Sequence, residues 1–156
     1  MNVSGSRSVQ GGPVTPDEIK RTGLAAIECF NDPARRDEYF ETLYEDDVVL
    51  HGYTPEPLTP KATVKGFYKA LFDAFPDCHV DTEAMYVEGD VLTWRFRFSG
   101  THTGTFQGIP PSGRSFSIPG ITILRFGAHR CVERWSVADF LGMMIQIGAI
   151  PAPPAA

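Results

Sequence analysis

Asp139 is the residue best placed for acid/base chemistry, because it stands where a predicted strand gives way to a predicted helix. Alternation of period two from Cys131 to Val137 puts Trp135 on the strand face that leads to Asp139, so we expect the carboxylate at the mouth of an apolar surface. A carboxylate held in an apolar pocket is a stronger base than one in water. Asp139 also occupies a helix N-cap position, where its side chain would only accept hydrogen bonds from the first helical N–H groups.

His51 and His102 are the candidate partners of Asp139, because a neutral imidazole can donate a hydrogen bond to an oxygen on which charge develops. His51 shares a predicted strand face with Val49 and Tyr53, so it either lines a pocket or is a hydrogen-bonded core histidine. His102 either faces the same pocket or anchors the glycine-rich connection that follows it.

Inward-facing side chains of the predicted elements supply the wall of a substrate pocket. The expected substrate-binding residues are Trp135, Tyr53, Phe67, Leu71, Trp94, Phe96, Thr122 and Leu124. An aromatic stripe on a helix is also the usual pattern of core packing, and a buried indole that finds a partner for its N–H explains Trp135 equally well. We expect a pocket that is mostly apolar, with few polar groups.

Composition and charge exclude several classes of partner. The net charge of -5 and the lack of a Lys/Arg stripe argue against nucleic acid, and no apolar run approaches the ~20 residues of a membrane span. Cys29, Cys78 and Cys131 are isolated, which is typical of reduced thiols in a cytoplasmic protein. No His, Cys or carboxylate set has the spacing of metal ligands, so we expect no metal site.

The elements that must position these residues follow from periodicity and turn signals. Thr15, Pro16 and Glu18 form the start of a first helix with a capping box. The remaining predicted elements are a short helix carrying Tyr39, Phe40 and Leu43, a strand over 46–53, an amphipathic helix over 64–75, strands over 79–87, 91–99 and 115–126, a strand ending at Asp139, and a short terminal helix.

This order predicts one α+β domain over residues 14–150, in which a curved, mostly antiparallel sheet wraps around the N-terminal helices. Polar, Gly/Ser-rich residues 1–13 and the Pro/Ala-rich residues 151–156 are expected to be tails. Residues 1–13 also lack the apolar segment of a secretory signal.

Six short motifs occur in order along the chain. They are Phe75-Pro76-Asp77, Glu88-Gly89-Asp90, Gly100-Thr101-His102-Thr103-Gly104, Gly108-Ile109-Pro110-Pro111-Ser112-Gly113-Arg114, Glu133-Arg134-Trp135-Ser136-Val137-Ala138-Asp139 and Gln146-Ile147-Gly148. In this order and spacing, from about His51 to Gly148, the chain resembles the SnoaL-like polyketide cyclase and ester cyclase family. The resemblance implies the cone-shaped α+β barrel of the nuclear transport factor 2-like superfamily, also called cystatin-like, with a pocket at its open end.

The resemblance also implies an activity, namely an intramolecular aldol condensation in which an aspartate at the position of Asp139 acts as general acid/base without metal or organic cofactor. Cyclases of the family place polar residues on the preceding strand, whereas residues 121–126 offer only Thr122 and Arg125. His51 and His102 are therefore the candidates for stabilising the enolate.

Two other functions compete with cyclisation. The pocket could belong to a non-catalytic module that binds a small molecule, or it could support an epoxide hydrolase or ketosteroid isomerase-like reaction. In each case the expected partner is an apolar, oxygenated small molecule, and the family resemblance adds a homodimer that packs sheet against sheet.

Overall fold

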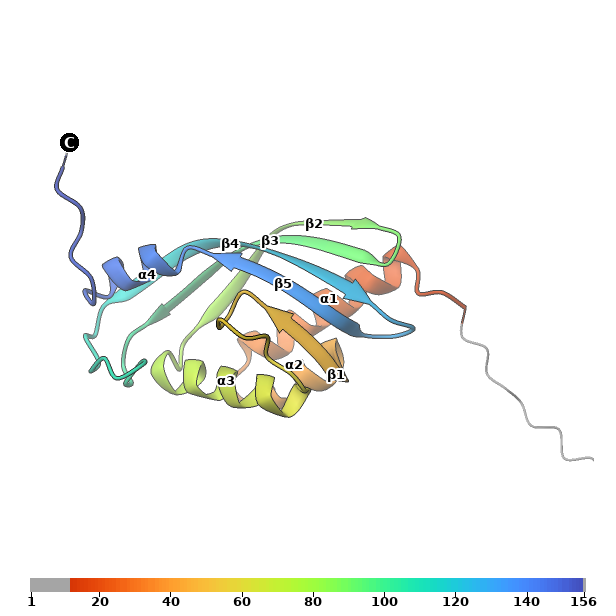
Figure 1. Ribbon diagram of the computed structural model, residues 1–156, viewed down its shortest axis with the longest axis horizontal. Coiled ribbons are helices and arrows are strands. Elements are labelled where there is room, and N and C mark those ends of the chain that lie inside the picture. Colours follow the sequence, from red (N-terminus) through yellow and green to blue (C-terminus); the bar gives the residue numbers. More distant parts are fainter. Residues whose placement is uncertain (1–11, 156) are drawn as a thin grey trace, which may run out of the picture.

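Helices and strands follow one another along the chain in the order that the hydrophobic pattern predicts (Figure 1). The computed structural model describes residues 12–155. Its helices are α1 (Pro16–Asn31), α2 (Arg36–Leu43), α3 (Lys61–Ala74) and α4 (Phe140–Gln146). Its strands are β1 (Tyr44–His51), β2 (His79–Glu88), β3 (Val91–Thr101), β4 (Ser115–Phe126) and β5 (Cys131–Ala138). In the described part of the chain, no helix has the length and apolar character that a membrane crossing requires.

The strands form a single curved sheet in the order β1-β5-β4-β3-β2, which is antiparallel except where β1 runs parallel to β5. Helices α1, α2 and α3 lie against one face of this sheet, and α4 lies at the end where β5 finishes (Figure 1). The prediction of an α+β fold with a mostly antiparallel sheet around the N-terminal helices is confirmed.

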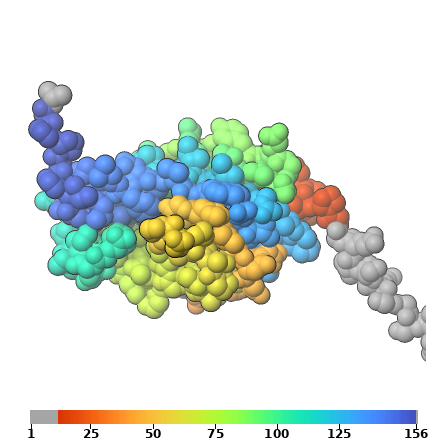
Figure 2. Space-filling view, viewed as in Figure 1, coloured from red at the N-terminus to blue at the C-terminus, as the bar shows by residue number. Residues whose placement is uncertain are grey.

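Two terminal segments were predicted to be tails. Most of the N-terminal segment, residues 1–11, lies outside the described residues. Residues 151–155 have no regular secondary structure and extend away from the body of the molecule (Figure 2).

Strand β4 shows how the sheet separates its two faces. Its side chains alternate strictly between buried and exposed over all 12 residues, as expected for a strand with one face on the core. On the outer face, Ile121 lies opposite Val137 and Ile123 lies opposite Trp135 across the β4–β5 pair. We call these four exposed apolar residues the outer patch; Val137 is 77% exposed.

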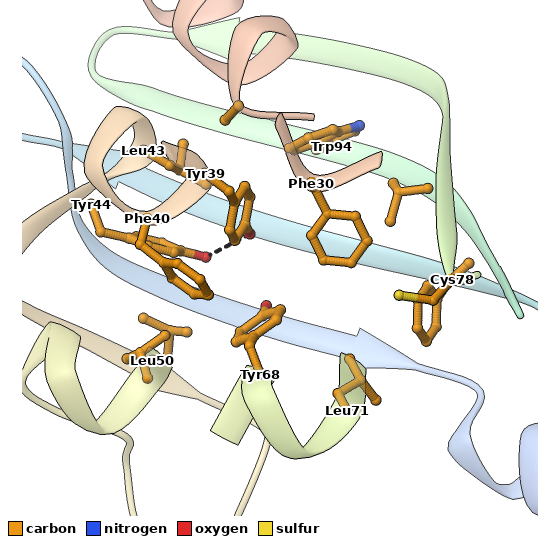
Figure 3. Close-up of a cluster of buried hydrophobic side chains, with 14 of the residues drawn as sticks. Phe30, Tyr39, Phe40, Leu43, Tyr44, Leu50, Tyr68, Leu71, Cys78 and Trp94 are labelled. Atoms are coloured by element: carbon orange, nitrogen blue, oxygen red, sulfur yellow. Dashed lines mark hydrogen bonds between the residues drawn. The ribbon is translucent and has the colours of Figure 1, made fainter. Parts of the chain in front are cut away.

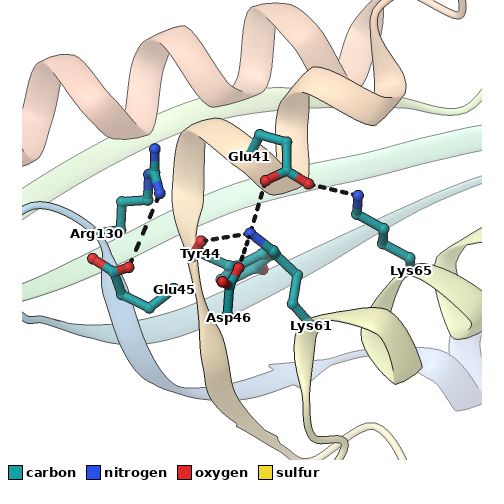
Figure 4. A network of polar contacts seen from close by, with 7 residues as sticks. All are labelled: Glu41, Tyr44, Glu45, Asp46, Lys61, Lys65 and Arg130. Carbon is teal, nitrogen blue, oxygen red and sulfur yellow. Dashed lines mark hydrogen bonds and ion pairs between the residues drawn. The ribbon is translucent and has the colours of Figure 1, made fainter.

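The buried lysine Lys61 connects α2, β1 and α3 (Figure 4). The Lys61 ammonium at the start of α3 lies 2.8 Å from a Glu41 oxygen of α2 and 2.7 Å from an Asp46 oxygen of β1. Lys65 binds the other Glu41 oxygen at 2.6 Å. A hydrogen bond from Lys61 and a smaller contribution from Lys65 lower the pKa of Glu41 to about 2. This network fixes α2, β1 and α3 relative to one another.

Candidate active site

An apolar cavity lies between the helices and the inner face of the sheet. Its volume is about 70 Å³, and since one water needs roughly 10–15 Å³ by the same measure, it has space for several waters or a small organic group. Aromatic rings form most of the wall. Figure 3 shows Tyr39, Tyr44 and Tyr68 meeting from three elements, with the hydroxyls of Tyr39 and Tyr44 3.0 Å apart.

Five of the eight predicted substrate-binding residues line this cavity: Tyr53, Phe67, Leu71, Trp94 and Phe96. Thr122 is fully buried just behind the wall, where its hydroxyl contacts Arg134. Leu124 packs in the core away from the cavity lining.

Trp135 lies on the outer face of the sheet, opposite to the face that the sequence predicts, because β5 contains an irregularity. Arg125 pairs with Glu133 and Phe126 pairs with Cys131, so Val132 is an extra residue in β5. One inserted residue moves every later side chain to the other face. As a result Arg134, Ser136 and Ala138 line the cavity, while Trp135 faces outward.

His51 belongs to the same outer face as Trp135. The two rings are stacked, with centroids 5.4 Å apart and planes 9° apart, and His51 Nε2 lies 3.0 Å from a Glu133 carboxylate oxygen. Arg125 donates to the other oxygen of Glu133 at 2.8 Å. Hydrogen bonds from Arg125 and then His51 lower the pKa of Glu133. The structure therefore does not bring His51 into the cavity.

His102 is fully buried, and its contacts are with the glycine-rich connection. Its Nδ1 accepts a hydrogen bond from the Ser112 backbone N–H at 3.2 Å, and its ring packs 5.5 Å from that of Phe75. The backbone N–H and C=O of His102 pair with Arg114 and Gly113. These contacts hold the connection against the end of the sheet, and His102 is absent from the cavity lining.

Asp139 caps α4 directly after the end of β5. Its exposed carboxylate accepts a hydrogen bond from the Gly142 backbone N–H at 2.9 Å. A Cβ at position 142 would lie 2.2 Å from Asp139 Oδ2, so a larger residue there would displace the capping carboxylate. The neighbours Ala138 and Phe140 line the cavity, whereas Asp139 itself does not. Its role as general acid/base stays a prediction.

Arg134 is the functional candidate that sequence reasoning missed. Only 6% of its surface is exposed, and all its assigned partners are hydroxyl groups. Nε donates to Thr122 at 2.7 Å and to Ser136 at 3.1 Å. Nη1 donates to Tyr44 at 2.6 Å and to Tyr39 at 3.0 Å. Among the described residues no carboxylate lies within 4.0 Å of this guanidinium, and its neighbour Glu133 points to the other face.

The phenols around Arg134 supply hydrogen bonds rather than negative charge. The Tyr53 hydroxyl lies 2.9 Å from Ser136 Oγ and 3.1 Å from the Tyr68 hydroxyl. Burial raises the pKa values of Tyr44, Tyr53 and Tyr68, and the nearby Arg134 offsets part of that rise. Burial alone would lower the pKa of Arg134, but the tyrosine oxygens hold it above its ordinary value, so the guanidinium stays charged.

Gly52 makes this arrangement possible on the β1 side. Its φ of +88° is in the left-handed region, and a Cβ there would lie 2.1 Å from the Ser136 carbonyl oxygen. Glycine therefore lets the chain after β1 run against β5 and place the Tyr53 hydroxyl on Ser136.

The described residues contain no group of three or more His, Cys, Asp or Glu side chains that could hold a metal ion. The polar groups that do converge on the cavity are a guanidinium and neutral hydroxyls. Such a set can polarise a carbonyl group or stabilise an oxyanion.

Comparisons with known proteins agree with this architecture. Residues 21–147 match the family model described as SnoaL-like polyketide cyclase. A comparison with curated proteins finds no match.

Several solved structures share the fold. AclR from Streptomyces galilaeus, described as a candidate hydroxylase, has a TM-score of 0.77 at 24% identity over 90% of this chain and 87% of its own. IdmH from Streptomyces antibioticus, described as a candidate polyketide cyclase, has a TM-score of 0.71 at 27% identity over 83% of this chain and 98% of its own. A SnoaL-like polyketide cyclase from Agrobacterium tumefaciens has a TM-score of 0.68 at 22% identity, over 83% of this chain and 98% of its own.

These structures confirm the fold that the motifs implied, that of the nuclear transport factor 2-like superfamily. Because the family model spans most of its length, the chain belongs to the SnoaL-like polyketide cyclase family.

Proposed function

We propose that this protein is a cyclase-type enzyme that closes a ring in a mainly apolar, oxygenated substrate by acid/base catalysis, without metal or organic cofactor. The observation that carries the proposal is a charged, buried Arg134 whose assigned partners are hydroxyl groups, set in the wall of an aromatic cavity. An aldol closure needs a group that stabilises an enolate, and a preorganised cation in an apolar site serves that need.

In the proposed reaction, a base removes a C–H proton next to a carbonyl group, and the enolate oxygen lies against Arg134. The enolate carbon attacks a second carbonyl of the same molecule, and the new alkoxide takes up a proton. Arg134 takes the role first expected of His51 and His102, since both imidazoles lie away from the cavity. Asp139 is the proposed acid/base, because its two sequence neighbours line the cavity wall.

Heptane-2,4,6-trione tests this proposal, because it is a short poly-β-ketone that can close a six-membered ring. Aldol closure and loss of one water convert it to 3,5-dihydroxytoluene, which chromatography separates from the triketone. We expect the protein to accelerate this conversion over buffer. Arg134→Met should lose about 10²–10³-fold of that acceleration, as for removal of one oxyanion-stabilising donor. Arg125→Met, which removes an arginine from the outer face, is the matched control and should retain it. No acceleration by the wild-type protein would reject the cyclase proposal.

A binding module is the second candidate, and one observation favours it. Among the described residues that line the cavity there is no Asp, Glu or His, so the wall itself holds no conventional base. A module of this kind would bind the triketone or a phenolic analogue without converting it. Measuring both the binding of the triketone and its conversion on one protein preparation separates the two functions.

We also propose that the outer patch packs against a second copy of the chain. Four exposed apolar side chains form two adjacent cross-strand pairs at the centre of a sheet face that α1, α2 and α3 leave uncovered. Charged residues of both signs, including Arg95, Arg125 and Glu133, surround the patch. A twofold axis through the patch would bring these opposite charges together across the interface.

A further inference from the structure

The hydrogen-bond inventory of Arg134 leaves one nitrogen free. A guanidinium has five N–H hydrogens, and the hydroxyl partners of Nε and Nη1 account for three of them. No partner for Nη2 is found among the described residues. Nη2 is also not among the fully buried atoms without a partner, so it keeps accessible surface. Because Arg134 is otherwise buried and belongs to the cavity wall, the two Nη2 hydrogens face the cavity.

The hydroxyl groups of Thr122, Ser136, Tyr53 and Tyr68, next to Arg134, have no hydrogen left to donate. The Thr122 hydroxyl donates to the Trp135 carbonyl at 3.0 Å, so its contact with Ser136 at 2.8 Å uses the hydrogen of Ser136. Ser136 must then accept from Tyr53, and Tyr53 must accept from Tyr68. In the pair Tyr39 and Tyr44 one hydroxyl donates to the other, which leaves a single neutral O–H group. Nη2 of Arg134 is therefore the charged donor that a ligand oxygen meets in this corner.

The positive charge of Arg134 also lacks a countercharge. Burial keeps Tyr44, Tyr53 and Tyr68 neutral, and it raises the pKa of the nearby Cys131 thiol to about 12. Glu133 is held on the outer face by His51 and Arg125. A buried charge without a partner is costly, and a negative ligand atom would relieve that cost.

We propose that the cavity binds its ligand as an anion with a single ionised oxygen, an enolate or a phenolate, on Nη2 of Arg134. A carboxylate is the poorer fit, because a bidentate fork needs N–H groups from two nitrogens and the hydroxyls already occupy Nε and Nη1. The proton of the enol or phenol passes to the buffer when the ligand binds. This inference rests on the proposed function in one respect only, that the cavity is the ligand site.

The probe is 4-nitrophenol, whose anion absorbs at a longer wavelength than the neutral phenol. Absorbance titrations of the wild-type protein across a range of pH give the dissociation constants of both forms. We expect the anion to bind at least about tenfold more tightly, which lowers the pKa of the bound phenol by at least about one unit. Arg134→Met should lose this preference and Arg125→Met should keep it. At a pH where both probes are ionised, 4-nitrobenzoate should bind at least about tenfold more weakly than 4-nitrophenolate.

Equal or tighter binding of the neutral phenol would overturn the proposal, as would tighter binding of 4-nitrobenzoate. If Arg134→Met fails to fold, the wild-type titration and the comparison of the two anions decide by themselves. The outcome is independent of turnover. Anion preference without conversion of the triketone would uphold this inference and reject the cyclase, and conversion without anion preference would do the reverse.

Discussion

Replacing Thr122 by valine tests whether the hydroxyl cluster supports the buried charge. Valine has nearly the same shape as threonine and suits a strand, so the substitution removes a hydroxyl group and leaves the packing in place. The lost hydroxyl accepts from Arg134 Nε at 2.7 Å and donates to the Trp135 carbonyl at 3.0 Å, in a fully buried position.

The expected loss follows from the charge of the donor. A hydrogen bond to a charged group contributes about 1.5–3 kcal/mol, and the Nε hydrogen would keep only its longer contact to Ser136, at 3.1 Å. For a domain of this size, 1 kcal/mol lowers the melting temperature by about 2–4 °C, so Thr122→Val should melt about 3–12 °C lower. Thermal unfolding followed by circular dichroism measures the shift, and urea unfolding gives the free energy directly.

Thr93→Val is the matched control. Thr93 lies on the outer face of β3, opposite Ile123, and no side-chain hydrogen bond is assigned to it among the described residues. Its substitution should change the free energy of unfolding by no more than about 0.5 kcal/mol. If the two variants are equally stable, the Thr122 hydroxyl does not stabilise the buried charge of Arg134.

Three further predictions concern other parts of the molecule. Asp139→Asn should keep the α4 cap and the melting temperature, whereas Asp139→Ala should lower the free energy of unfolding by about 1 kcal/mol. If Asp139 is the acid/base, the Asn variant should also close the triketone ring about 10²–10⁴-fold more slowly. Full activity of the Asn variant rejects that role. Val137→Glu should convert the expected dimer to a monomer in sedimentation velocity, and a wild-type monomer would contradict the proposed interface. The pKa of Glu41 is lowered from 4.5 to about 2, so the stability that its charge contributes is present above pH 4.5 and is lost as the pH falls towards 2. Glu41→Gln should therefore make the free energy of unfolding less dependent on pH in that window. An unchanged dependence would show that the contact with Lys61 adds nothing to stability.

Local patterns were enough to predict the elements. The alternation of Ser115 to Phe126 marks β4 with the observed bounds, and the capping box of Thr15 and Glu18 marks the start of α1. The parallel pairing of β1 with β5 could not be predicted in the same way, because these strands are distant in sequence and their contact depends on the whole sheet.

The candidate site was harder to predict, because it depends on one residue of register. Without the extra residue Val132, Trp135 would face inward and Arg134 would face solvent. An arginine in the middle of a strand normally indicates the exposed face, which is the reason for missing Arg134. The available signal was the small pair Ser136 and Ala138, which follow Arg134 at period two and leave space for a ligand.

The distance in sequence between Arg134 and its tyrosines has a consequence for the order of events on the ribosome. Its contacts to Tyr39 and Tyr44 span 95 and 90 residues, so the phenols are synthesised long before the guanidinium that they bind. Contacts this distant form slowly, because a long loop must close first. A nascent chain that ends after β4 lacks β5, which is the strand that pairs with β1 and carries Arg134. The candidate site therefore assembles only after the last strand has been made, and no shorter translation product contains it.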